Sequence, residues 1–134
     1  MNLEFVYINE VGPRDGLQNQ KTILDSATRL ELINHLIDAK LPGIEVASFV
    51  NPKVVPAMNG AREIIQGLSE IKDCEISVLV PNMKGFDMAQ EAGAKIIAVV
   101  PSATETMNQK NINMGLQETI NSSCEILKHA KSSH

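Results

Sequence analysis

The chain has 134 residues, of which 43% are hydrophobic and 21% charged, and its formal net charge at pH 7 is −4. This composition is typical of a globular protein. There is no basic stripe and only 3% of the residues are aromatic, so we expect no nucleic-acid partner. No apolar run approaches the about 20 residues that a bilayer-spanning helix needs, so we expect no membrane partner either.

Short runs rich in valine and isoleucine alternate with helical patterns along the chain. Each run ends in proline, glycine or a small polar residue, which predicts a buried strand. The first helical pattern follows a possible cap at Asp25 or Ser26 and repeats apolar residues at helical spacing from Leu30 to Leu41. The predicted strands cover residues 5–11, 43–49, 75–80 and 95–100, and the later predicted helices cover 56–68, 84–91 and 116–128.

Strand and helix therefore alternate four times. This order predicts an α/β fold with a parallel sheet and right-handed crossovers. Four βα units are half of a TIM (β/α)8 barrel, which needs roughly 250 residues in all. We expect residues 1–134 to form a single domain, a half-barrel that stops where a fifth strand would begin.

Polar residues gather where the predicted strands end. Arg14 and Asp15 follow the first strand, Ser48 ends the second, Asn82 follows the third, and a Ser/Thr/Glu-rich segment at 102–106 follows the fourth. In parallel barrels the carboxyl ends of the strands meet at one face, where the active site lies. The sequence thus predicts a site at this face.

The segment Gly12-Pro13-Arg14-Asp15-Gly16 has two interpretations. Proline presets φ, aspartate bonds the following backbone, and glycine tolerates positive φ, so this is also ordinary turn chemistry. The other interpretation is functional, because a fixed cation lies beside a carboxylate that can bind a metal. That pairing suits the stabilisation of an enolate.

The longer string Val-Gly-Pro-Arg-Asp-Gly-Leu-Gln-Asn, at 11–19, resembles the first-strand signature of the hydroxymethylglutaryl-CoA lyase family. These are divalent-metal TIM-barrel enzymes. The wider superfamily of isopropylmalate and homocitrate synthases shares the Arg-Asp-Gly core but usually lacks the Gly-Leu-Gln-Asn that follows. Further matches run in order along the chain: Ile44-Glu45, Ser48-Phe49-Val50, Pro52-Lys53, Val55-Pro56, Pro81-Asn82, Lys84-Gly85-Phe86, Ala92-Gly93-Ala94-Lys95 and Lys110-Asn111-Ile112-Asn113.

The resemblance implies a carbon–carbon lyase that cleaves 3-hydroxy-3-methylglutaryl-CoA into acetyl-CoA and acetoacetate, a reaction of leucine catabolism and ketone-body metabolism. It implies that Asp15 binds a divalent cation, Mg²⁺ or Mn²⁺, and that Arg14 stabilises the developing enolate. Its substrate partner would be an acyl-CoA. Gln18 and Ser48 would be second-tier polar contacts, and Lys110 with Asn111 would reach the CoA portion from the fourth loop.

Glu45 interrupts an apolar run at a position expected to face the barrel interior. An unpaired buried carboxylate is costly, so Glu45 needs a partner, and Arg14 is the candidate. Glu45 would then orient Arg14 or border the substrate, and we include it with Arg14 among the catalytic candidates. The alternative is a purely structural ion pair lining the barrel, which is also our interpretation of Glu10.

The sequence departs from the family pattern in several ways. The family's His-x-His pair, its ligand asparagine and its cysteine on a glycine-rich loop come from later strands and have no counterpart here. Cys74 and Cys124 have no partner at metal or redox spacing, so we interpret both as buried or half-buried thiols. Asp15 alone cannot satisfy a cation that wants about six ligands. The chain by itself is therefore expected to be inactive.

Half a barrel leaves its first and fourth strands as open edges, which invite pairing. We expect either part of a longer lyase or a self-associating half-barrel, with a two-fold dimer as the simplest homo-oligomer. Two other functions stay open: a non-catalytic acyl-CoA-binding half-barrel, and a related Claisen-type synthase or aldolase. The start of the chain, Met1 to Glu4, resembles neither a signal nor a transit peptide, which makes a cytoplasmic location the default.

Overall fold

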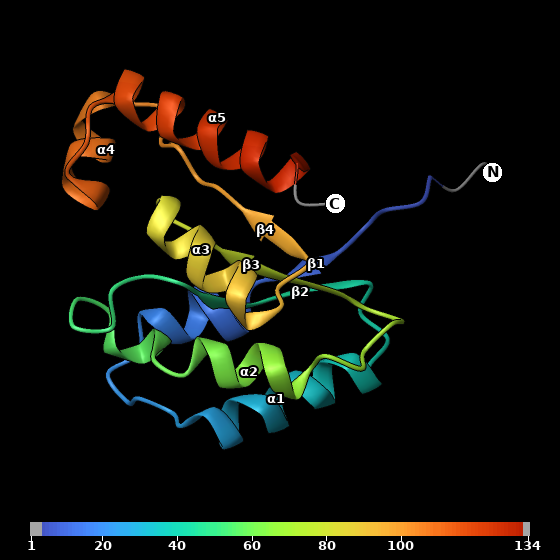
Figure 1. The fold of residues 1–134 in the computed structure, drawn as a ribbon. Helices are drawn as coiled ribbons and strands as arrows, with labels where there is room; N and C mark the ends of the chain where they lie inside the picture. Colours follow the sequence, from blue (N-terminus) through green and yellow to red (C-terminus); the bar gives the residue numbers. More distant parts are fainter. Residues whose placement is uncertain (1–3, 133–134) are drawn as a thin grey trace.

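The computed structural model describes residues 4–132. Four parallel strands form one sheet in the order β1-β2-β3-β4, so every strand pairs with the next one in the chain (Figure 1). The parallel alternation of strand and helix predicted from the sequence is confirmed. The strands are β1 (Asn9–Glu10), β2 (Gly43–Ser48), β3 (Glu75–Leu79) and β4 (Ile96–Ala98), and the helices are α1 (Ser26–Asp38), α2 (Ala61–Gly67), α3 (Met83–Ala92), α4 (Glu105–Ile112) and α5 (Leu116–Ser132).

One face of the sheet is covered by helices, and the hydrophobic core lies there. The side chains of β2 and β3 that face the helices include Ile44 and Val78. Both are fully buried, in one core cluster with Ile33 of α1, Ile64 of α2 and Phe86 of α3. Burial of aliphatic side chains at these positions is worth about 1.5–3 kcal/mol each. The core therefore fixes the two middle strands most firmly.

Local signals in the sequence set the helix ends. Of the two predicted caps, Asp25 rather than Ser26 caps α1: its carboxylate accepts a hydrogen bond from the Thr28 N–H at 2.8 Å. The Asn82 side chain caps α3 in the same way, through the Gly85 N–H at 2.9 Å. The Gly93 backbone ends α3 at φ +91°, a conformation that glycine adopts without strain.

Two elements differ from their predicted extents. The predicted strand over 5–11 pairs only at Asn9–Glu10, and the exposed residues 4–8 run away from the sheet (Figure 1). The predicted helix over 56–68 is split into a 3-10 turn at Pro56–Met58 and helix α2. The split occurs at Gly60, whose φ of +79° no regular helix contains.

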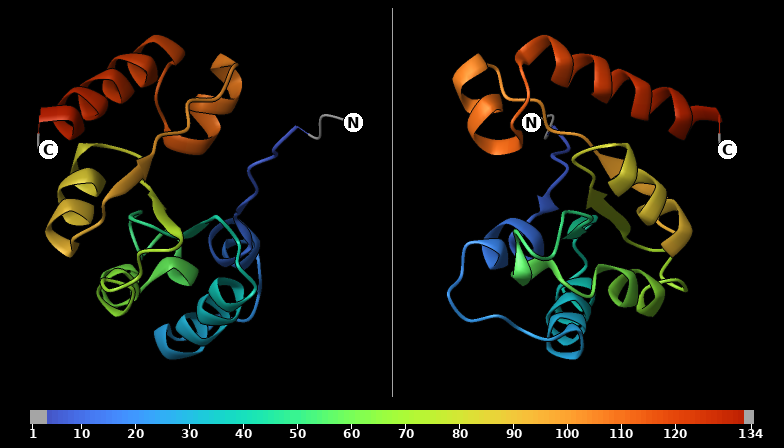
Figure 2. Two further views of the ribbon diagram at one scale, coloured as in Figure 1. Left: turned by 90° about the vertical axis from the view of Figure 1, so that its right-hand side faces the viewer. Right: turned by 60° about the vertical axis from the view of Figure 1, so that its left-hand side comes forward.

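A helical arm, α4 with α5, follows β4. Both helices lie together at one end of the molecule, away from α1 and α2 (Figure 2). Helix α4 is an addition to the prediction, which treated this segment as a loop. The buried Asn108 side chain exchanges two hydrogen bonds with the backbone of Ser102, at 2.9 and 3.0 Å, and so fixes the start of the arm. Ile126 of α5 joins the core.

The pairing of β2 with β3 contains an irregularity. Glu45 pairs with Ser77 and Ala47 pairs with Val78, so Val46 is an extra residue in β2. An inserted residue of this kind is a β-bulge, which redirects the side chains that follow it. The bulge lies directly after Glu45, one of the candidate site residues.

Candidate active site at the carboxyl ends of the strands

The segment after β1 folds into one turn of π-helix, Gly12–Gly16. The backbone N–H groups of Arg14 and Asp15 both donate to the Val11 carbonyl, at 3.1 and 2.7 Å. The Glu10 carboxylate accepts from the Gly12 N–H at 2.7 Å and so ties the strand to the turn. Short π-helical turns occur often at functional sites. The Leu17 N–H donates to the Gly12 carbonyl five residues back, so the turn is wider than an α-helical one, and it presents Arg14 and Asp15 side by side.

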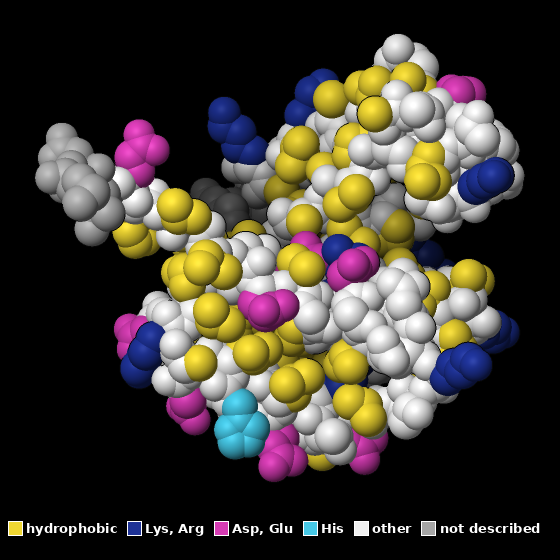
Figure 3. Space-filling model, turned by 180° about the vertical axis from the view of Figure 1, so that it is seen from behind, with side chains coloured by type: hydrophobic (Ala, Val, Ile, Leu, Met, Phe, Trp, Pro, Cys, Tyr) yellow, Lys and Arg dark blue, Asp and Glu magenta, His cyan; other side chains and the backbone are white. Residues whose placement is uncertain are grey.

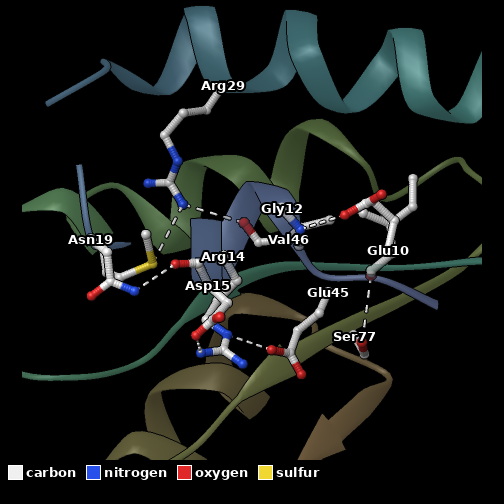
Figure 4. Close-up of polar contacts among 11 residues, drawn as sticks. Glu10, Gly12, Arg14, Asp15, Asn19, Arg29, Glu45, Val46 and Ser77 are labelled. Carbon is white, nitrogen blue, oxygen red and sulfur yellow. Dashed lines mark hydrogen bonds and ion pairs between the residues drawn. The ribbon is translucent and has the colours of Figure 1, made fainter. Parts of the chain in front are cut away.

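Arg14 lies between two carboxylates. Its Nε donates to Glu45 Oε1, and its Nη1 donates to Asp15 Oδ1 at 2.7 Å (Figure 4). The side chains of Arg14 and Glu45 are only 15% and 7% exposed, whereas that of Asp15 is 56% exposed. The predicted pairing of Glu45 with Arg14 is confirmed. A guanidinium held by two carboxylates keeps a fixed position and a permanent charge.

The exposed carboxylate of Asp15 opens toward a pocket of about 430 Å³ at the same end of the sheet. Gln18 also lines this pocket, and its buried Oε1 has no hydrogen-bond partner in the structure. On the opposite wall, α4 contributes Asn111. The apolar lining residues are Val50, Val55, Leu79, Val80, Pro81, Val99, Val100, Ile112 and Met114.

The space-filling view shows this region as a hollow between the arm and the rest of the molecule. Hydrophobic side chains gather along it, with basic and acidic side chains at its centre (Figure 3). An apolar hollow with a few convergent polar groups is the usual form of a small-molecule site. The pocket therefore combines an apolar wall, which could contact an apolar part of a ligand, with the charged side chains of Arg14 and Asp15.

Not all predicted site residues share this pocket. Ser48 is buried and its Oγ has no hydrogen-bond partner among the described residues, but it lines a separate hollow with Asn59 and Met88. Lys110 is exposed and does not line the pocket. The prediction of a fourth loop carrying Lys110 and Asn111 was wrong, because both residues lie on helix α4.

Three hydroxyl residues of α5 line the pocket and were not among the predicted site residues: Thr119, Ser122 and Ser123. Their spacing of three and four residues places them on one helix face. That spacing is visible in the sequence, but nothing in the sequence says that this face of α5 turns toward Arg14. The spacing of these hydroxyl residues therefore indicates a site only when the position of α5 in the fold is known.

Away from this pocket, few titratable groups have a clearly shifted pKa. At the opposite end of the sheet, the Tyr7 hydroxyl donates to Glu75 (2.6 Å) and to the Pro42 carbonyl (3.1 Å). The bond to Glu75 is the main cause that raises the pKa of Tyr7 to about 12. Cys74 is buried, as predicted, but the same prediction was wrong for Cys124, which is exposed on α5. Within residues 4–132 no three acidic, histidine or cysteine side chains cluster as a metal site.

The fold and the site together define a class of protein. Four parallel βα units carry an Arg–Asp–Glu cluster at the carboxyl ends of their strands, which is half of a TIM-barrel enzyme with its charged site in the usual place. No helix within residues 4–132 is both long and apolar enough to cross a bilayer.

Comparison with known proteins gives the family. Residues 5–134 match the HMGL-like family, and the chain belongs to it. The mitochondrial hydroxymethylglutaryl-CoA lyase of Bos taurus is 44% identical over 126 residues, which are 94% of this chain and 39% of that protein. The 3-hydroxy-3-isohexenylglutaryl-CoA/hydroxymethylglutaryl-CoA lyase of Pseudomonas aeruginosa is 41% identical over 132 residues, which are 98% of this chain and 44% of the relative.

Solved structures agree with this assignment. The HMG-CoA lyase of Brucella melitensis superimposes with a TM-score of 0.92 at 40% identity, covering 98% of this chain and 46% of that one. The lyase of Acinetobacter baumannii, solved with coenzyme A and 3-methylmalate, gives a TM-score of 0.88 at 34% identity and covers 94% and 41% of the two chains. The chain thus spans less than half the length of the relatives it matches. The predicted half-barrel is confirmed.

Proposed function

We propose that this chain supplies the N-terminal half of a carbon–carbon lyase that cleaves 3-hydroxy-3-methylglutaryl-CoA into acetyl-CoA and acetoacetate. Residues 1–134 would form a single domain that contributes four of the eight βα units. The observation that carries the proposal is the buried Arg14–Glu45 pair beside the exposed carboxylate of Asp15. Family membership supports the same reaction.

In the proposed reaction the C3 hydroxyl loses its proton to a base, the C2–C3 bond breaks, and its electron pair moves into an enolate on the thioester oxygen. Protonation of that enolate gives acetyl-CoA. Arg14 would lie where the negative charge develops, and its guanidinium cannot lose its proton at physiological pH. Glu45 would fix the direction of Arg14, because their bond occupies Nε and both side chains are mostly buried.

The residues of the pocket are compatible with a divalent cation, Mg²⁺ or Mn²⁺. The carboxylate of Asp15 is exposed and the unpartnered Oε1 of Gln18 lines the same pocket, and both are oxygen donors of the kind that hard cations prefer. We propose that Asp15 is a ligand. A bound cation would act as a Lewis acid on substrate oxygens.

The substrate would be an acyl-CoA. The relative from Acinetobacter baumannii was solved with coenzyme A and 3-methylmalate, which supports this class. In our proposal Gln18 is a polar contact of the substrate, and Asn111, which lines the same pocket, reaches the CoA portion. Ser48 and Lys110 are retained as substrate contacts that would have to act from beside the pocket, since neither lines it.

The test is a hybrid enzyme in which this chain replaces the matching N-terminal part of the Pseudomonas aeruginosa lyase. We expect the hybrid to release acetoacetate from 3-hydroxy-3-methylglutaryl-CoA in a coupled dehydrogenase assay. Substitution Arg14→Met should lower kcat by about 10²–10³-fold, the usual cost of removing one group that stabilises an oxyanion. Turnover of Arg14→Met within a few-fold of the parent hybrid would rule out the enolate role.

A matched control separates chemistry from general damage. Arg62 pairs with Glu91 at 3.0 Å on the exposed surface of α2 and α3, so Arg62→Met removes an arginine without touching the pocket. It should leave kcat unchanged. Ligand-dependent melting without acetoacetate release would favour an acyl-CoA-binding half-barrel, and turnover of a different acyl-CoA or keto acid in a substrate panel would favour a Claisen-type synthase or aldolase.

We further propose that the protein is a homo-oligomer, most simply a dimer. Open edges at β1 and β4, and exposed apolar residues such as Phe5 and Val100, support association. Size-exclusion chromatography with light scattering tests this, and a stable monomer would contradict it. Cytoplasmic location and a role in leucine catabolism or ketone-body metabolism stay predictions. Microscopy would decide the location, since several relatives are named mitochondrial.

A further inference from the structure

Arg29 lies on the first turn of α1 and is almost completely buried, with 1% of its surface exposed. Its Nη1 donates to the Asn59 carbonyl at 2.9 Å, and its Nη2 donates to the Val46 carbonyl at 3.3 Å. The Met58 sulfur lies 3.9 Å from the same Nη2. One guanidinium therefore bridges helix α1, strand β2 and the segment that leads into α2 (Figure 4).

The charge of Arg29 is unusual because it has no acidic partner among the residues that the structure describes. Its bonds go to two carbonyls and a sulfur, and Nε has no partner. Burial lowers the pKa of Arg29. Removing a charge from water is costly, and an apolar side chain of similar length would avoid that cost. The hydrogen bonds of Arg29 therefore need an explanation other than simple core packing.

The Val46 carbonyl belongs to the bulge in β2. Side chains of a regular strand alternate, so residues three apart, such as Glu45 and Ser48, would lie on opposite faces. In this structure Glu45 pairs with Ser77 and Ser48 pairs with Leu79, and those two partners are only two residues apart on β3. Paired residues of neighbouring strands share a face. The inserted Val46 thus places Glu45 and Ser48 on the same face.

We propose that Arg29 is a positioning residue for the candidate active site. Arg29 stabilises the bulge because it donates a hydrogen bond to the carbonyl of Val46, the inserted residue that has no partner on β3. The bulge in turn sets the direction in which Glu45 meets Arg14. Any effect of Arg29 on catalysis rests on the proposed function. Its effect on the Arg14–Glu45 pair does not rest on that function, and it can be measured without an activity assay.

The experiment follows the Arg14 Nε–H, which bonds Glu45, by nitrogen-15 NMR of this chain. Its hydrogen-exchange rate reports directly on that pair. Two variants, Arg29→Met and Arg29→Lys, are compared with the parent at a temperature well below each melting point. Methionine has no donor for the two carbonyls, so we expect exchange to be faster by about tenfold or more, whereas lysine keeps one ammonium and should give a smaller increase.

Arg62→Met is the matched control, since Arg62 bonds only the exposed Glu91 in the structure. It should leave Arg14 exchange unchanged. A purely structural role for Arg29 predicts a lower melting temperature with Arg14 exchange at the parent rate in every folded Arg29 variant, and that result would overturn the proposal. If Arg29→Met does not fold, Arg29→Lys decides alone: faster exchange supports the proposal and the parent rate overturns it.

Discussion

Strands β2 and β4 belong to the same sheet but differ in almost every physical respect. All six residues of β2 are buried, and the strand pairs with β1 on one side and β3 on the other. Strand β4 has three residues, pairs only with β3, and leaves Ile96 38% exposed. Glu45 of the candidate site lies on β2, whereas β4 contributes no residue to the site pocket, which is lined by Val99 and Val100 just after the strand.

The contrast shows where this chain is structurally complete. Glu45 is held by its pairing with Ser77 on β3 and by its bond to Arg14, all within the first three βα units. The residues around β4 still present apolar surface, as Val100 does. A second half of a barrel would cover such surface, and the relatives are more than twice as long as this chain.

The sharpest test of the contrast compares two isoleucines. Ile44 on β2 is fully buried, so Ile44→Ala should lower the free energy of unfolding by about 2–5 kcal/mol. Ile96→Ala on β4 makes the same chemical change at a half-exposed position and should cost about 1 kcal/mol or less. Urea unfolding followed by circular dichroism measures both. Equal losses would contradict the view that β4 is loosely held.

A second comparison uses two glutamates. Glu45→Gln removes the buried partner of Arg14 and should cost about 1–3 kcal/mol, because the guanidinium is then left without its full counter-charge. Glu31→Gln, at an exposed site on α1, should change stability by no more than about 0.5 kcal/mol. A Glu45→Gln variant as stable as the parent would mean that the pair adds no net stability.

The smallest effect concerns the amino ends of the strands, where Tyr7 bonds Glu75. The chain has one tyrosine and no tryptophan, so phenolate absorbance reports on Tyr7 alone. Its pKa of about 12 exceeds the usual value of about 10. This contact therefore stabilises the fold below about pH 10 and loses its effect as the pH rises toward 12. In Glu75→Gln the titration should return toward 10, and a midpoint that stays near 12 would exclude Glu75 as the cause.

The general architecture was predictable because its signals are local. Valine- and isoleucine-rich runs gave the strands, and the Asp25 cap gave the start of α1. The Arg14–Glu45 pair was predictable for a different reason: a carboxylate within an apolar strand needs a partner, and few cations were available.

Other features depend on tertiary structure and were missed. Helix α4 is mostly polar, so it shows no apolar stripe, although Thr104 caps it through the Met107 N–H at 3.3 Å. Residues 5–8 have the pattern of a strand but pair with no other strand within residues 4–132. The bulge at Val46 is a matter of register between two strands, and no pattern within one strand reveals it.

The order of the sheet also bears on how the chain folds during synthesis. Each strand pairs with the strand that precedes it in the sequence, so no strand has to wait for a distant part of the chain. Contacts between near neighbours cost less loop entropy and form faster than distant ones. Arg14 and Glu45 come from the first two βα units, so we expect their pair to form while β4 and the arm are still being made on the ribosome.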